Sequence, residues 1–395
     1  MQTQSFHCLG ETSVEEFLAQ YWQKKPLLIR NAFAEISPPI SAEELAGLAC
    51  EEQVNARLVI ENAASNHWQV EFGPFDESRF KQLPKTHWSL LVSDVEKHCP
   101  ETRYLINAFR FIPDWRVDDL MISYAPEGGS VGPHTDAYDV FLLQLSGHRL
   151  WQISEQFDTT SIEGIDLSIL KSFTAEQEWL LNPGDMLYLP PNVAHHGVAQ
   201  NHGSKDGEEQ HCMTASIGFR APSLKTLSSD YIHYLNENVH DATRYRDKNP
   251  VLQKHHAEIT QQTVDDFIDY LKQGMSLERK HVTRWLGQYC SDNKAFEDIN
   301  HSAHDELQPV TYLELLETID GNTLIQSPYS HFLFSYEEDE ALLFVDGICY
   351  QVSKEFAECI CTDDTVNFQQ LSEGMTEIEQ SVLLDLFNSG AIIIA

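Results

Sequence analysis

Between about residues 120 and 219 the chain consists of short apolar stretches separated by turns rich in Gly and Pro, and this pattern restricts the fold most strongly. Short apolar runs between turn signals are typical of β-strands. We expect strands over Leu120–Tyr124, Tyr138–Leu145, Leu150–Ile153, Trp179–Leu181, Met186–Leu189 and Met213–Phe219. Many short strands with such connections predict a sandwich or a barrel.

Two turn signals in this region predict hairpins. Ser146-Gly147 would turn the second of these strands back along the third, and Pro183-Gly184-Asp185 would turn the fourth back along the fifth. Residues 155–177 and 200–210 are more polar and are interpreted as excursions from the β-scaffold.

A candidate metal site begins with His134 and Asp136, because residues i and i+2 of an extended segment point to the same face. A later histidine, His195 or His196, follows Pro190-Pro191, and adjacent residues in a strand face opposite ways, so only one of the two should reach the metal. Two imidazoles and one carboxylate leave positions open, as in non-haem Fe(II) oxygenases. A His-x-Asp pair alone is weak evidence for a metal site, since a histidine near a solvated aspartate gives the same sequence pattern by chance.

Arg149 lies on the strand after the first predicted hairpin turn. A co-substrate with two carboxylates needs one end on the metal and the other on a cation, and arginine binds a carboxylate through a bidentate pair. Alone, Arg149 would be interpreted as a surface arginine beside an acid, but with the other parts of the site present we favour the co-substrate role. Ser123, on the strand before the metal site, is a candidate hydrogen-bonding partner of the same co-substrate, although strand serines often bond to the backbone.

The N-terminal region alternates helical and extended patterns. We expect helices over Thr12–Tyr21, Ala42–Leu48 and Trp88–Lys97, and strands over Leu27–Ile29, Arg57–Ile60 and Trp68–Phe72. Ser41 with Glu44 forms a capping box that fixes the start of the second helix.

After Ala221-Pro222 the apolar spacing becomes helical, and residues 223–300 are interpreted as a helical domain. Its apolar stripes need a partner face, either a second copy of the chain or the barrel. Residues 301–395 predict a small α+β unit whose helices and β-wing suggest a winged helix. Lys354 is the only Lys or Arg in this segment, so we reject DNA binding and interpret the unit as a protein-contact module.

The formal net charge of −35 disfavours nucleic acids and anionic membranes. It fits a basic partner and, equally, a surface charge that serves only solubility or adaptation to salt. The eight cysteines form no C-x-x-C pair and suggest neither a zinc knuckle nor a disulfide framework. No basic stretch followed by an apolar run opens the chain, and no apolar run has the length of a membrane span. We expect a reduced, cytoplasmic protein.

Two longer motifs carry a resemblance. Residues 111–123 (FIPDWRVDDLMIS) and 131–141 (VGPHTDAYDVF) resemble the Jumonji-C, cupin-type 2-oxoglutarate oxygenases, and most closely the bacterial ribosomal oxygenases, which hydroxylate an arginine of a large-subunit ribosomal protein. Residues 21–28 and 216–222 are also similar to that group. The resemblance is specific over residues 1–222, and beyond them it rests on domain order.

The resemblance implies an α+β protein with a double-stranded β-helix catalytic domain over 1–222, a helical dimerisation domain over 223–300 and an acidic winged-helix-like domain over 301–395. It implies that His134, Asp136 and His195 hold Fe(II), His195 because the family ligand follows Pro-Pro after three residues. Arg149 would bind the distal carboxylate of 2-oxoglutarate, with Ser123 nearby.

The expected function is therefore an O2-consuming protein hydroxylase whose substrate is a basic ribosomal protein, with an arginine side chain as first choice and histidine as second. The expected assembly is a homodimer. Other hypotheses are a cupin metalloenzyme that does not use 2-oxoglutarate and a non-catalytic adaptor. Lysine demethylation ranks below them.

Overall fold

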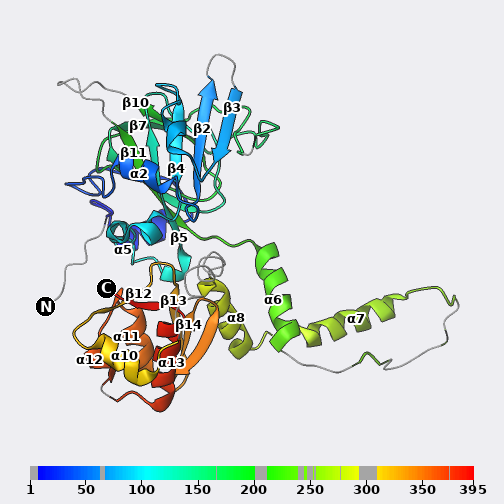
Figure 1. Cartoon of the computed structure of the whole chain (residues 1–395). Helices are drawn as coiled ribbons and strands as arrows, with labels where there is room; N and C mark the ends of the chain where they lie inside the picture. The colour runs from blue at the N-terminus through cyan, green and yellow to red at the C-terminus, as the bar shows by residue number, and fades with distance from the viewer. Residues whose placement is uncertain are drawn as a thin grey trace. The chain divides into compact units, whose positions relative to one another are not determined.

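The computed structural model of the chain (Figure 1) divides into two compact units, residues Met1–Ala221 and Pro222–Ala395. The structure describes residues 8–62, 67–165, 167–200, 211–238, 244–246, 252, 255–275, 277–292, 309–372 and 374–395. The predicted excursion at 200–210 lies almost wholly outside these residues, as does the predicted domain boundary near residue 300. The division into three domains therefore stays a prediction.

The N-terminal unit contains two antiparallel sheets. The larger sheet has the order β1-β9-β6-β11-β5-β4-β2-β3, and the smaller has the order β10-β7-β8. The strands are β1 (Leu27–Ile29), β2 (Ala56–Asn62), β3 (His67–Phe72), β4 (Trp88–Val92), β5 (Val117–Ala125), β6 (Asp139–Ser146), β7 (His148–Ser154), β8 (Gln177–Leu181), β9 (Met186–Leu189), β10 (Ala194–Gln200) and β11 (Cys212–Phe219). The predicted double-stranded β-helix is confirmed.

Both predicted hairpins are wrong. β6 pairs with β9 and β11, whereas β7 pairs with β8 and β10, so the chain changes sheets at Ser146-Gly147. It changes sheets again at Pro183-Gly184-Asp185, because β8 lies in the smaller sheet and β9 in the larger one. The hairpin that does form joins β7 to β8 through the long connection at residues 155–176. A turn signal marks a reversal but leaves open which sheet receives the next strand.

Helices precede and separate the first strands of this unit. They are α1 (Val14–Gln20), α2 (Ala42–Leu48), α3 (Glu77–Phe80), α4 (Val95–His98) and α5 (Arg103–Asn107), with 3-10 turns at Pro100–Thr102 and Asp114–Arg116. Ser41 and Glu44 form the predicted capping box of α2. The predicted helix at Trp88–Lys97 is wrong, because its first half is β4, a central strand between β2 and β5. Most of β4 is buried, so its apolar run shows no clean alternation.

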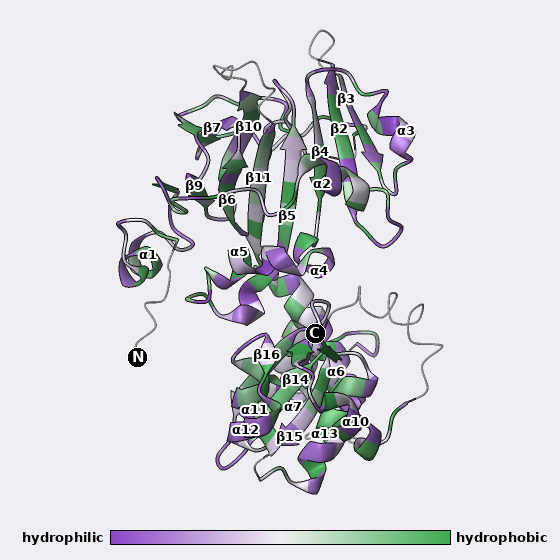
Figure 2. Ribbon diagram, turned by 60° about the vertical axis from the view of Figure 1, so that its left-hand side comes forward, coloured by the Kyte–Doolittle hydropathy of each residue, from purple (hydrophilic) through white to green (hydrophobic). Residues whose placement is uncertain are grey.

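The main core of the N-terminal unit is rich in aromatic residues and borders a buried carboxylate. Asp139, at the start of β6, is fully buried and accepts hydrogen bonds from the Tyr188 hydroxyl (2.6 Å), Arg116 Nη2 (2.9 Å) and Gln23 Nε2 (3.0 Å). A buried charge is tolerated when it is paired and hydrogen-bonded in this way. The network ties the residues after α1 to β6, three residues beyond Asp136. Figure 2 shows the apolar segments of β5 and β6 in green.

The C-terminal unit begins with the helices α6 (Leu224–Asn238), α7 (Gln261–Gly274) and α8 (Arg279–Ser291). Tyr231 and Leu235 of α6 pack with Trp285 of α8 in a small core. The Trp285 indole N–H donates to Asp230 at 2.7 Å. By contrast, no residue of α7 is buried.

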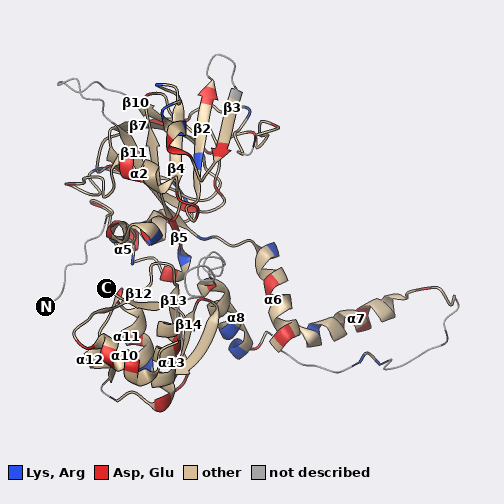
Figure 3. Cartoon of the chain, in the orientation of Figure 1, with Lys and Arg blue, Asp and Glu red and all other residues tan. Residues whose placement is uncertain are grey.

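The rest of this unit is a small α+β arrangement. Its elements are α10 (Tyr312–Ile319), β12 (Leu324–Gln326), β13 (Phe332–Tyr336), β14 (Ala341–Val345), β15 (Ile348–Val352), α11 (Lys354–Cys361), β16 (Thr365–Val366), α12 (Phe368–Ser372), α13 (Glu377–Asn388) and β17 (Ile392–Ile394). The predicted wing strands form the sheet β13-β14-β15, and α8 packs against it, with Gln288 Nε2 donating to the Gly347 carbonyl at 2.9 Å. The sheet β16-β12-β17 and helix α11 were not predicted. Figure 3 shows acidic residues spread over the elements of both units. Among the described residues, no helix is long and apolar enough to cross a bilayer.

Candidate metal centre and pocket

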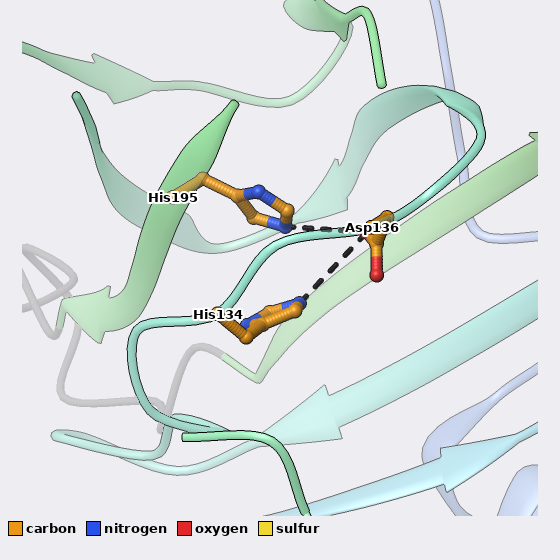
Figure 4. Close-up of side chains that lie close together, drawn as sticks. All are labelled: His134, Asp136 and His195. Carbon is orange, nitrogen blue, oxygen red and sulfur yellow. Dashed lines mark ion pairs between the residues drawn. The ribbon is translucent and has the colours of Figure 1, made fainter. Parts of the chain in front are cut away.

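The three side chains predicted as metal ligands lie together in the N-terminal unit (Figure 4). His134 and His195 form a two-residue antiparallel bridge, in which each backbone N–H donates to the other carbonyl at 3.0 and 2.9 Å. Their rings lie 4.2 Å apart between centroids. Asp136 Oδ2 is 3.9 Å from His134 Nε2 and 3.5 Å from His195 Nε2, and the possible ligand atoms all lie within 4.8 Å of one another.

Backbone carbonyls orient both rings. Nδ1 of His134 lies 2.9 Å from the Gly132 carbonyl, and Nδ1 of His195 lies 3.0 Å from the Val193 carbonyl. A carbonyl accepts only, so Nδ1 carries the proton and Nε2 presents its lone pair to the centre, as a metal-binding imidazole requires. Burial, with the neighbouring His134, lowers the pKa of His195 to about 4, so the ring is neutral near pH 7.

His196 lies on the other side of β10. It pairs with Gln152 in the ladder, one position along from His195, and its ring lies 6.0 Å from that of Phe173. Burial lowers its pKa to about 4 as well. His196 lies outside the group of three possible ligands, and the period-two alternation that predicted a single ligand explains this position.

A cavity of about 340 Å³ opens beside the three side chains. Ser123 and Arg149, the two residues predicted to bind a co-substrate, both line it together with His134, Asp136 and His195. The structure therefore brings all five predicted site residues to one pocket.

Arg149 is buried against this pocket. The side chain is 3% exposed, and its Nε and Nη2 atoms have no hydrogen-bond partner among the described residues. The guanidinium carbon lies 5.7 Å from the centre of the Trp151 ring. An unpaired buried cation is unfavourable in a folded protein. Its charge and donors therefore fit an anionic ligand in the pocket.

The hydroxyl groups of two pocket-lining residues, Ser123 and Thr214, are already engaged in hydrogen bonds. Ser123 Oγ donates to the Thr214 carbonyl at 3.4 Å, a long contact, and Thr214 Oγ1 donates to Gln144 Oε1 at 3.1 Å. Gln144 is itself held by Nε2, which donates to the Ser146 carbonyl at 2.7 Å. Ser123 is therefore the hydroxyl with the weaker present bond.

Several pocket residues were missed from the sequence, and the clearest are Leu167, Ser168 and Ile169. They belong to the connection at 155–177, which looked like a polar excursion. Ile169 instead packs in a buried cluster with Val59 of the larger sheet. The signal that was available is the alternation of Ile165, Leu167 and Ile169 in the sequence. Arg57, Tyr138 and Trp151 also line the pocket and were not predicted.

Comparison with known proteins places this geometry in a family. Residues 104–227 match the model of the JmjC domain. The chain is 36% identical over 285 residues to the ribosomal protein uL16 3-hydroxylase of Escherichia coli, and the match covers 72% of this chain and 73% of that protein. The chain belongs to the JmjC ribosomal oxygenase family. The predicted family is therefore confirmed.

Other members agree with this placement. The chain is 44% identical over 225 residues to the probable ribosomal oxygenase of Haemophilus influenzae, covering 56% of this chain and 53% of that one. The crystal structure of E. coli YcfD superposes with a TM-score of 0.84 at 29% identity, over 98% of this chain and 99% of that chain. Another structure of that ribosomal oxygenase, with a TM-score of 0.80, is a complex with cobalt and 2-oxoglutarate.

Proposed function

We propose that this ribosomal oxygenase family member is an Fe(II)- and 2-oxoglutarate-dependent hydroxylase that modifies an arginine side chain of a large-subunit ribosomal protein. One observation carries the proposal. Two imidazoles and a carboxylate converge on a pocket that also holds a buried arginine with unpaired donors. This combination fits a metal chelated by one end of a dicarboxylate whose other end needs a cation.

In this proposal His134, Asp136 and His195 hold the iron. The carbonyls of Gly132 and Val193 keep the two ring protons on Nδ1, so Nε2 of each ring faces the centre. When bound, the iron and 2-oxoglutarate supply the oxidation of a C–H bond by O2, with release of succinate and CO2. The three ligands leave positions open for the co-substrate.

Arg149 anchors the distal carboxylate, and Ser123 is the hydroxyl beside it. The Ser123 hydroxyl holds its present acceptor at 3.4 Å, near the long limit of a hydrogen bond, so rotation toward a carboxylate gives up little. Leu167 and Ile169 cover part of the pocket with apolar surface and help to exclude water.

The charge of the chain and the names of its relatives both support a basic ribosomal protein as the substrate. A net charge of −35 favours a basic protein, and the E. coli relative is named a ribosomal protein hydroxylase. Arginine is first choice because the motifs most resemble the arginine hydroxylases. Histidine is the alternative, since a relative from Aedes aegypti, 24% identical over 204 residues, is named a bifunctional lysine-specific demethylase and histidyl-hydroxylase. A ribosomal substrate in turn favours the cytoplasm.

The test is mass spectrometry of ribosomal proteins from cells with and without the gene. We expect one large-subunit protein to carry the mass of one added oxygen atom only when the gene is present. Fragmentation of that protein should locate the added oxygen on an arginine. Complementation with Asp136→Ala is the matched control and should not restore the modification. Identical ribosomal proteins in all strains would refute the proposed substrate.

A cupin enzyme that does not use 2-oxoglutarate remains the rival function. Calorimetry of the Mn(II)-loaded chain with 2-oxoglutarate separates the two, because the rival has no use for the buried Arg149. An adaptor without activity predicts no succinate production with ribosomal extracts.

We also propose that the chain forms a homodimer through α7. Its apolar residues Val264, Phe267, Ile268 and Leu271 follow one helical stripe, yet they are between 43% (Phe267) and 62% (Leu271) exposed. Such a stripe gains stability by burial against a second copy. Light scattering on the purified chain tests this, and a monomer at micromolar concentration would refute it.

A further inference from the structure

We propose that Trp151 is a further co-substrate-binding residue, whose indole N–H donates to the same carboxylate that Arg149 binds. This inference rests on the proposed function, because it takes 2-oxoglutarate as the ligand of the pocket. Trp151 carries no charge and belongs to none of the sequence motifs described above.

The first observation is an unpaired donor. Trp151 lines the pocket and is 5% exposed, and its Nε1 atom is buried without a partner among the described residues. Arg149 and Trp151 are the two pocket-lining residues of the described chain with such buried donors. An indole N–H can only donate, and a buried donor left without an acceptor is unfavourable.

The second observation is the placement of the two donors. Arg149 and Trp151 are residues i and i+2 of β7, so both side chains leave the same face of the strand. The guanidinium carbon lies 5.7 Å from the Trp151 ring centre, and the His195 ring lies 5.8 Å from it on centroids. Trp151 therefore lies close to both the anchor and a proposed iron ligand.

The third observation is that Gly197 fixes the ring. Gly197 is the ladder partner of Trp151 on β10, and a Cβ built on it would lie 2.6 Å from Cη2 and Cζ3 of the indole. The six-membered edge of the ring thus lies directly over the glycine. In an indole the N–H is on the opposite edge, so it is directed away from β10.

A carboxylate has room for both donors. It offers about four lone-pair sites, of which a bidentate arginine uses two. The Ser123 hydroxyl proposed for the same carboxylate takes a third site, which leaves one site for the indole N–H. A dicarboxylate held by Arg149 would therefore provide the acceptor that the indole N–H lacks.

The test is calorimetry of the full chain loaded with Mn(II) and titrated with 2-oxoglutarate. Trp151→Phe keeps a ring and removes the donor, and we expect about ten- to hundredfold weaker binding, the loss of one hydrogen bond to a charged group. Trp179→Phe is the matched control, because Trp179 is the ladder partner of Trp151 on β8 and does not line the pocket. It should bind as the wild type does. Both variants should bind Mn(II) normally.

A second ligand identifies the carboxylate. In 2-oxopentanoate a methyl group replaces the distal carboxylate, so wild type and Trp151→Phe should bind it equally. An equal loss with both ligands would overturn the proposed contact, as would full affinity of Trp151→Phe for 2-oxoglutarate. If the wild type itself does not bind 2-oxoglutarate, the proposed function fails, and that outcome is separate.

A third measurement needs no variant. The chain has seven tryptophans, and among them only Trp151 lines the pocket of the described chain. In Zn(II)-loaded protein with 15N-labelled indoles, 2-oxoglutarate should shift one indole N–H signal strongly downfield. The absence of any such shift at saturating ligand would also overturn the inference.

Discussion

Replacement of Arg149 by methionine should weaken the binding of 2-oxoglutarate without lowering the stability of the ligand-free protein. Methionine keeps an unbranched side chain of similar reach and removes the charge and all donors. A hydrogen bond to a charged group contributes about 1.5–3 kcal/mol, so loss of a bidentate pair amounts to about 3–6 kcal/mol. The dissociation constant for 2-oxoglutarate should therefore rise by about a hundredfold to ten-thousandfold.

The ligand-free protein should respond differently. Nε and Nη2 of Arg149 are buried and unpaired among the described residues, so Arg149→Met removes an unfavourable burial. The contact that it loses is the cation–π contact with Trp151 at 5.7 Å, which contributes less than the burial costs. We expect the free energy of unfolding without ligand to equal or exceed that of the wild type. If Arg149 were instead a structural residue, its removal would leave its hydrogen-bonding partners unpaired and would lower the free energy of unfolding.

Thermal unfolding with Mn(II), with and without 2-oxoglutarate, measures both effects. At a concentration one hundred times the wild-type dissociation constant, the ligand should stabilise the wild type by about 2.7 kcal/mol and the variant by almost nothing. Arg57→Met is the matched control, since Arg57 lines the same pocket from β2. It should retain ligand stabilisation. The reasoning would be refuted if Arg149→Met without ligand melted well below the wild type, or if 2-oxoglutarate still raised the melting temperature of the variant.

Three further predictions concern other parts of the molecule. His195→Ala should lose Mn(II) binding in paramagnetic resonance titrations whereas His196→Gln keeps it, and equal losses would contradict the assignment. Burial raises the pKa of Glu96 from 4.5 to about 8, so the stability that its protonation contributes is complete below pH 4.5 and is lost as the pH rises through 8. Glu96→Gln should therefore raise the melting temperature at pH 9 but not at pH 5. The rise should be about 2–4 °C for each kcal/mol gained in the free energy of unfolding, and equal changes in melting temperature at both pH values would contradict the prediction. Leu271→Asp should halve the mass measured by light scattering, and an unchanged mass would show that α7 is not the interface.

The site was predictable from the sequence because its parts are locally encoded. His134 and Asp136 share a face through the period of an extended segment, and Pro190-Pro191 marks the return of His195. The role of Arg149 was predicted because a dicarboxylate co-substrate needs a cation at the end that does not bind the metal. The structure brings these residues, with Ser123, to one pocket.

The pairing of strands was not predictable in the same way. Ser146-Gly147 is a turn in sequence and in structure, but β6 and β7 enter different sheets. Register and sheet membership depend on strands far along the chain, such as β10 and β11, which no local window contains. The connection at 155–177 was interpreted as a polar excursion because the partners of Ile169, residues of β2 and β4, lie far away in the sequence.

One ladder, between β7 and β10, places three of the residues that line the pocket, Arg149, Trp151 and His195. Its register places Ile153 opposite His195, Trp151 opposite Gly197 and Arg149 opposite Ala199. Side chains of directly opposed residues leave the same face of a sheet. A slip of one residue would therefore turn Arg149 and Trp151 outward and bring Leu150 and Gln152 in their place. This pairing thus sets the position of the proposed iron ligand His195 relative to the proposed anchor Arg149, so changes that weaken this ladder should reduce 2-oxoglutarate binding even when every proposed ligand is intact.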